Sequence, residues 1–135
     1  MLSAPEICEI TNRLEIRLGV DALWVFGSQA KGTSRRDSDV DLAVLFRRSP
    51  SPMELAEARQ ELAAALGRDV DMVDLVRASP VVAMQVLRHG RLVLDASPRR
   101  RRQFAAAVPG RYEDLKILRR QAERALLARV RRGRS

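Results

Sequence analysis

Two aspartates, Asp39 and Asp41, stand at the start of the apolar run at residues 40–46. Charged side chains are costly to bury and are seldom kept in a core without a partner. Side chains two positions apart on a strand point the same way, with Cα atoms about 6.5 Å apart, so the two carboxylates should project together. Such neighbours repel, and a divalent cation removes the repulsion. Magnesium prefers carboxylate, phosphate and water oxygens, and two such ions can stabilise the oxygens that attack and leave in phosphoryl transfer.

A third carboxylate would complete a metal site, and the apolar run at residues 69–75 offers one. Asp69 and Asp71 share one face of this expected strand, whereas Asp74 points to the other. Asp71 lies nearer the middle of the strand and is favoured as the partner of Asp39 and Asp41. Asp69 is the alternative.

Residues that suit a nucleotide's phosphates precede the aspartate pair. Gly27 and Ser28 follow an expected strand at residues 22–26, where glycine allows a close backbone approach and serine adds a hydroxyl donor. Lys31 and Arg35 place positive charge in the same segment, where a triphosphate needs it. About 13 residues join the two expected strands, and loops of this length are often functional.

Further elements follow from the hydrophobic periodicity and from Pro, Gly and Ser positions. We expect an N-terminal helix between Ser3 and Gly19, helices at residues 53–66 and 79–87, and a fourth strand at residues 91–95. The tail should be helical to about residue 130, with a break at Pro109-Gly110. Strands that alternate with helices predict an α/β or α+β fold around one small sheet.

Composition limits the class of protein. The chain has 135 residues, 46% of them hydrophobic and 31% charged, which fits one globular domain. No apolar run reaches the roughly 20 residues of a membrane span, and the N-terminus lacks the pattern of a secretory signal. A single cysteine excludes an internal disulfide and a cysteine-based zinc site. These features predict a cytoplasmic protein.

Charge divides the chain into a core, residues 1–96, and a basic helical extension, residues 97–135, which we expect to pack on the same domain. The first part carries 12 basic and 14 acidic residues, whereas the second carries 13 and 3. Such asymmetry is typical of a segment that meets an acidic partner or a polyanion, although a solvated helix face would give the same count.

The run Gly27-Ser28, ten further residues, then Asp39-Val40-Asp41 resembles the signature of polymerase-β-like nucleotidyltransferases. More closely, residues 27–46 resemble the minimal nucleotidyltransferase (MNT) proteins, and the tail resembles the C-terminal helices of their antitoxin branch, which pairs with HEPN toxins. The resemblance implies a small mixed sheet flanked by helices. It implies phosphate binding by Gly27 and Ser28, metal binding by Asp39 and Asp41 with Asp71, and a place for Arg35 near the phosphates.

The same resemblance implies an antitoxin that moves AMP from ATP onto a hydroxyl of a HEPN toxin, with tyrosine as the expected acceptor. Mg²⁺, expected as two ions, would assist this transfer. Asp71 is then the candidate to accept the hydroxyl proton, and the two proteins form a hetero-oligomer. A non-catalytic antitoxin remains an alternative, because Leu115, Leu118, Ala122 and Leu126 could dock on a partner helix. An aminoglycoside-type nucleotidyltransferase and direct nucleic-acid binding through residues 99–102 are less favoured.

Overall fold

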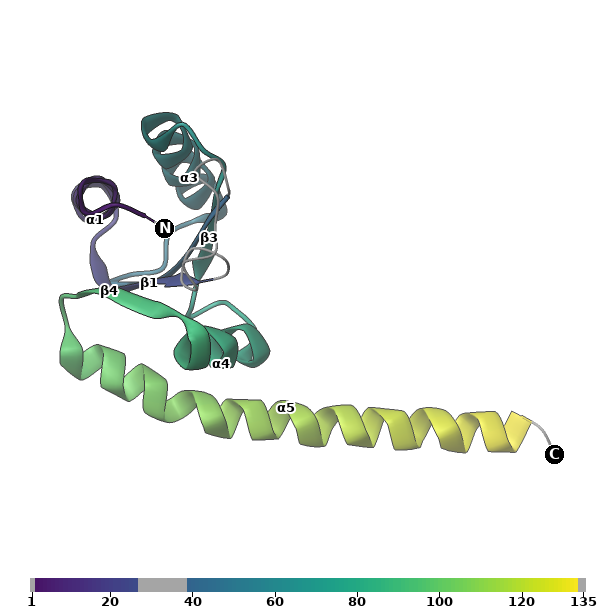
Figure 1. Cartoon of the computed structure of the whole chain (residues 1–135). Helices are drawn as coiled ribbons and strands as arrows, with labels where there is room; N and C mark the ends of the chain where they lie inside the picture. The colour runs from purple at the N-terminus through teal and green to yellow at the C-terminus, as the bar shows by residue number, and fades with distance from the viewer. Residues whose placement is uncertain (1, 27–38, 134–135) are drawn as a thin grey trace.

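The computed structural model describes residues 2–26 and 39–133, in which helices and strands follow one another along the chain (Figure 1). The elements are α1 (Ala4–Arg17), β1 (Val20–Phe26), β2 (Val40–Phe46), α3 (Pro52–Leu66), β3 (Val70–Asp74), α4 (Pro80–His89), β4 (Arg91–Asp95) and α5 (Pro98–Gly133). These bounds agree with the sequence-based expectations to within a few residues. Among the described residues, no helix is both long and apolar enough to cross a bilayer.

The strands form one mixed sheet in the order β3-β2-β1-β4. β1 pairs antiparallel with β2 and with β4, whereas β2 pairs parallel with β3. A parallel neighbour requires a crossover, which α3 supplies. Helices α1 and α3 cover one face of the sheet, and α4 and α5 cover the other (Figure 1). The mixed α+β fold expected from the sequence is confirmed.

The alternation of side chains along β2 divides the core into two layers. Val40, Leu42, Val44 and Phe46 are fully buried in the layer beneath α1 and α3. Ala43 and Leu45 face the layer beneath α4 and α5. Asp41 alternates with the first set, so its side chain belongs to the α4 and α5 side of the sheet.

Local capping fixes where α1 and α3 begin. The hydroxyls of Ser3 and Ser51 each accept a hydrogen bond from the backbone N–H three residues on, and the carboxylates of Glu6 and Glu54 accept one from the cap residue's own N–H. These capping boxes satisfy donors that the first helical turn leaves unpaired. Gly67 ends α3 with φ at +66°, in the left-handed region that glycine adopts at little cost.

The start of α5 is fastened to the sheet by two arginines. Arg100 Nη1 lies 2.7 Å from Asp21 Oδ2 and also donates to the backbone carbonyl of Phe46. Arg101 Nε donates to Asp95 Oδ1 at 2.9 Å. Further along, Val108 is fully buried and Phe104 packs against the same core layer. Two of the four arginines at residues 99–102 therefore bind this protein's own carboxylates.

The expected break at Pro109-Gly110 is wrong, because α5 runs continuously from Pro98 to Gly133 with Pro109 inside it. A proline in a helix interior lacks one hydrogen-bond donor and crowds the preceding turn, at a cost of about 3 kcal/mol. Val108, the residue directly before the proline, is fully buried, and this packing offsets part of that cost. The helix bends along its first half but does not end there (Figure 1).

Candidate active site

The parallel register of β2 and β3 brings two carboxylates together from distant parts of the chain. Asp41 is the direct partner of Asp71, just as Val40 is the partner of Val70. Partners on neighbouring strands lie about 4.8 Å apart and point to the same side of the sheet. Asp41 is half-buried and Asp71 is exposed. Asp71, the third acid favoured from the sequence, thus lies beside Asp41.

The electrostatics of Asp41 show that a third carboxylate is close. Burial raises the pKa of Asp41, and the negative charges of Asp71 and Asp39 raise it further. Three acids therefore lie close enough for the charges of two to disfavour ionisation of the third. A bound cation would reverse this effect, because it favours the charged form of every nearby carboxylate.

Asp69, the alternative third acid, occupies a different position. It lies just before β3, where its carbonyl oxygen accepts a 2.9 Å hydrogen bond from the N–H of Val40. Its side chain is exposed and lines a small cavity with Asp39, Ala63, Gly67 and Arg68. Asp39 thus lines the cavity together with Asp69 and is also close enough to Asp41 for its charge to act on that carboxylate.

Metal binding by these acids stays a prediction. Over residues 2–26 and 39–133, no three or more histidine, cysteine or acidic residues form a ready-made metal site. The donor chemistry nonetheless fits magnesium, since the clustered groups are carboxylates and one of them carries a raised pKa.

The proposed phosphate-binding residues Gly27, Ser28, Lys31 and Arg35 lie outside the described residues. The residues that flank this segment are described. Phe26, the last residue of β1, pairs directly with Asp41. Phe26 and Asp39, the described residues on either side of this segment, therefore both lie near Asp41.

Two arginines near the acids were missed by the sequence reasoning. Arg59 on α3 places Nη1 3.9 Å from Asp71 Oδ1. Arg68 is almost fully buried, and its Nη2 lies 2.9 Å from Glu6 Oε2 on α1. Arg68 could have been identified as a site residue from its place in the sequence, because it lies between the glycine that ends α3 and the first residues of β3. No local pattern in the sequence indicated Arg59, because its neighbour Asp71 is distant in sequence.

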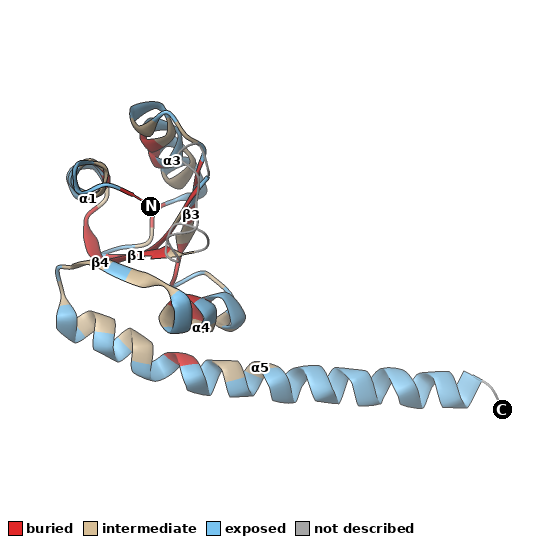
Figure 2. Ribbon diagram, viewed as in Figure 1, coloured by how far each residue is buried: buried red, intermediate tan, exposed pale blue. Residues whose placement is uncertain are grey.

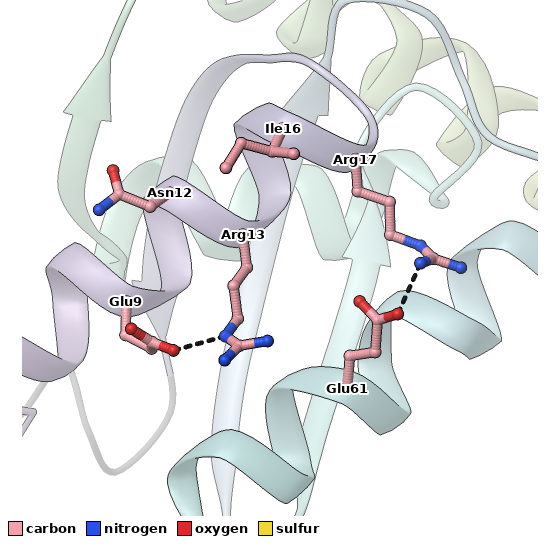
Figure 3. A pocket seen from close by; sticks show the side chains of 6 residues that line it. All are labelled: Glu9, Asn12, Arg13, Ile16, Arg17 and Glu61. Carbon is pink, nitrogen blue, oxygen red and sulfur yellow. Dashed lines mark hydrogen bonds and ion pairs between the residues drawn. The ribbon is translucent and has the colours of Figure 1, made fainter.

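A second cavity lies between α1 and α3 and has a different character (Figure 3). Its two arginines are already paired with acids: Arg13 lies 2.5 Å from Glu9, and Arg17 lies 2.5 Å from Glu57 and 2.6 Å from Glu61. Such paired cations have little capacity left for a phosphate. None of the acids at residues 39, 41, 69 and 71 lines this cavity.

A small mixed sheet that carries an aspartate pair at the start of one strand and another acid on its parallel neighbour is the arrangement of a polymerase-β-like nucleotidyltransferase. The model of the family described as "Polymerase beta, Nucleotidyltransferase" matches residues 8–99, and the chain belongs to this family. The family assignment inferred from the glycine, serine and aspartate spacing is confirmed.

The particular relatives are protein adenylyltransferases and toxin–antitoxin components. The protein adenylyltransferase MntA of Shewanella oneidensis is 44% identical over 69 residues, which are 51% of this chain and 50% of that protein. The match thus spans half the length of this relative. A crystal structure of a toxin–antitoxin with AMP-PNP contains a chain with a TM-score of 0.78 and 30% identity, over 90% of this chain and 98% of that one.

A further solved structure is described as a tri-AMPylated Shewanella oneidensis HEPN toxin in complex with MNT antitoxin. One of its chains has a TM-score of 0.74 and 27% identity, over 91% of this chain and 97% of that one. The similarity therefore includes most of α5 as well as the sheet.

Proposed function

We propose that this chain is the antitoxin of a HEPN/MNT toxin–antitoxin pair and transfers AMP from ATP to a hydroxyl of its partner toxin, with tyrosine as the expected acceptor. The observation that carries the proposal is the direct pairing of Asp41 with Asp71, with Asp39 nearby. The adenylyltransferase relative and the AMPylated toxin complex support the choice of nucleotide and partner.

In the proposed reaction, the acceptor oxygen attacks the α-phosphorus of ATP. A new oxygen–phosphorus bond forms, the bond to pyrophosphate breaks, and the hydroxyl proton passes to a carboxylate, for which Asp71 is our candidate. Asp39, Asp41 and Asp71 would hold Mg²⁺, expected as two ions, which offsets charge on the phosphate oxygens. Gly27, Ser28, Lys31 and Arg35 are proposed to bind the phosphates.

The half-buried position of Asp41 suits a metal ligand, and the exposure of Asp71 suits a proton acceptor. A partly desolvated carboxylate interacts more strongly with a cation, because water screens it less. An exposed carboxylate can reach a hydroxyl that is presented by a second protein. Since the described core is small, the toxin would supply the other wall of the site.

We also propose that residues 97–135 are an extension of the core at residues 1–96, packed on the same domain. The ion pairs of Arg100 and Arg101 and the burial of Val108 support this. The same ion pairs make residues 99–102 a poor nucleic-acid site, because two of the four cations already have protein partners.

The proposal predicts that a reading frame beside the one for this chain encodes a HEPN toxin. The test combines that purified toxin with this chain, Mg²⁺ and ATP labelled at the α-phosphate. We expect label on the toxin with the unmodified chain and none with Asp39→Ala/Asp41→Ala. The matched control, Glu57→Ala/Glu61→Ala, removes two exposed acids on α3 and should keep full transfer.

Two outcomes would overturn the enzymatic proposal. If the unmodified chain transfers no label and the Asp39→Ala/Asp41→Ala variant still neutralises the toxin, the protein acts by binding alone. If label appears on an aminoglycoside and not on the toxin, the acceptor is a small molecule.

A further inference from the structure

The distal part of α5, residues 109–133, extends away from the rest of the molecule. α5 packs mainly against α4 and β1, and none of the described residues beyond Val108 is buried (Figure 2). In Figure 1 the helix runs past α4 and continues as a single rod. Most helices in proteins owe their stability to an apolar face that packs against a neighbour. Tyr112 and Leu115 are half-buried, whereas every residue from 116 to 133 is exposed, so this outer part of the segment has no such neighbour within the described structure.

An apolar stripe runs along this exposed segment. Leu118, Ala122, Leu126 and Val130 follow one another at steps of four residues. Each residue turns a helix by about 100°, so the four side chains stay within about 120° of one another. Leu118 and Leu126 are each 61% exposed and Val130 is 42% exposed. A row of exposed aliphatic side chains on one side of a helix is typical of an interaction surface.

Three arginines lie in the same sector of the helix. With the same rotation of about 100° per residue, the positions of Arg111, Arg119 and Arg129 fall within the sector that carries the apolar stripe. None of the three makes an ion pair within the described part of the chain. The residues from 111 to 133 contain eight basic and three acidic side chains. The surface is therefore apolar and basic at once.

This charge selects the kind of partner. If two copies of the chain paired through the stripe in parallel, each arginine would face its own counterpart. In the antiparallel arrangement with the two stripes in full overlap, Arg119 of one copy would lie near Arg129 of the other. Both arrangements bring like charges together at the edge of an apolar contact, which disfavours them. A groove lined by aliphatic side chains and bordered by aspartates or glutamates fits instead.

We propose that the stripe formed by Leu118, Ala122, Leu126 and Val130, with Arg111, Arg119 and Arg129, docks in an acid-bordered apolar groove on the partner toxin. This inference rests on the proposed function for the identity of the partner. α5 and the side chain of Asp41 lie on the same side of the sheet. A toxin held by α5 therefore approaches the side of the molecule on which Asp41 and its strand partner Asp71 lie.

The test uses the full chain and the purified HEPN toxin encoded beside it. Leu118→Glu/Leu126→Glu puts two negative charges into the stripe without touching a buried residue. The matched control is Ile117→Glu/Gln121→Glu, which changes the net charge equally at two exposed positions outside the stripe. Circular dichroism confirms that each variant remains folded. Calorimetry gives the Kd of each for the toxin, and labelled ATP gives the rate of AMP transfer as a function of toxin concentration.

We expect the stripe variant to bind at least tenfold more weakly and the control to change by less than threefold, as for residues at the centre of an interface. The rate of transfer by the stripe variant should recover at high toxin concentration, because its carboxylates are intact. Equal effects of the two variants, or no effect of either, would overturn the docking surface.

Two other occupants are also tested. Sedimentation of the chain alone would reveal a dimer that only the stripe variant loses, and that result would assign the surface to a second copy. Binding of a labelled RNA that is lost only in the stripe variant would assign it to nucleic acid. Either result refutes the toxin as occupant. The failure of the proposed function looks different: the unmodified chain would bind the toxin through the stripe yet transfer no AMP.

Discussion

Replacement of Asp41 by asparagine should make the protein more stable while it removes the proposed activity. Asp41 lies beside Asp71 and near Asp39, and burial together with these two charges raises its pKa. The folded state therefore disfavours the ionised form of Asp41 relative to the unfolded chain. Asparagine has nearly the same shape and no charge, so Asp41→Asn removes this penalty at neutral pH.

The magnitude follows from the strand spacing. Two unit charges about 4.8 Å apart repel by about 0.9 kcal/mol in a medium with the dielectric constant of water. Salt screens this repulsion because both side chains remain partly accessible to solvent, and Asp39 adds a smaller share. We expect a net gain of about 0.5–1 kcal/mol, which for a chain of this size raises Tm by about 2–4 °C.

The sign of the pH dependence gives a sharper test. The pKa of Asp41 is raised above its ordinary value of 3.8, so the folded state binds the proton more tightly than the unfolded state does. The contribution of Asp41 to stability therefore falls as the pH rises from its ordinary pKa through its raised pKa in the folded state. The advantage of Asp41→Asn should be full at pH 7 and should shrink as the pH approaches 4.

Thermal unfolding followed by circular dichroism at pH 7 and at pH 4.5, without metal, measures this effect. Asp114→Asn, at an exposed position on α5, is the neutral control. Asp95→Asn should have the opposite sign, because Asp95 is bound by Arg101. The reasoning is refuted if Asp41→Asn lowers Tm at pH 7, or if its effect is the same at both pH values.

Two further substitutions test the scaffold. Arg100→Gln should cost about 2 kcal/mol in urea unfolding, because it leaves the buried Asp21 with only Arg47 at 3.7 Å; an unchanged midpoint would mean that α5 is not fastened at this point. Gly67→Ala should cost about 1 kcal/mol in the same assay, since φ is +66° and no atom lies within 4 Å of an added Cβ, so the cost is conformational alone; a stabilising effect would contradict the left-handed cap.

Local patterns in the sequence were sufficient for most of the elements. The alternation of apolar residues in β2 predicted both its bounds and the side chains on each face, because a strand has a period of two. Pro and Gly positions marked most helix ends, because these residues restrict or free the backbone locally. The spacing from Gly27 to Asp41 identified the family, since that signature lies within one continuous segment.

The sequence did not decide the features that depend on contacts between distant segments. It left Asp69 and Asp71 as alternatives, and only the register of β2 against β3 places Asp71 beside Asp41. The predicted break at Pro109 was wrong because a local rule cannot include the burial of Val108. The ion pair of Arg100 with Asp21 likewise joins residues that nothing in the sequence connects.

The sequence by itself thus determined which residues could do chemistry and the type of element on which each lies, because these properties follow from residue type and short-range spacing. The tertiary structure decided which carboxylates meet, which arginines are already paired and which part of α5 stays uncovered. Those outcomes depend on distances between segments that are far apart along the chain, and such distances are set only when the sheet and its helices pack together.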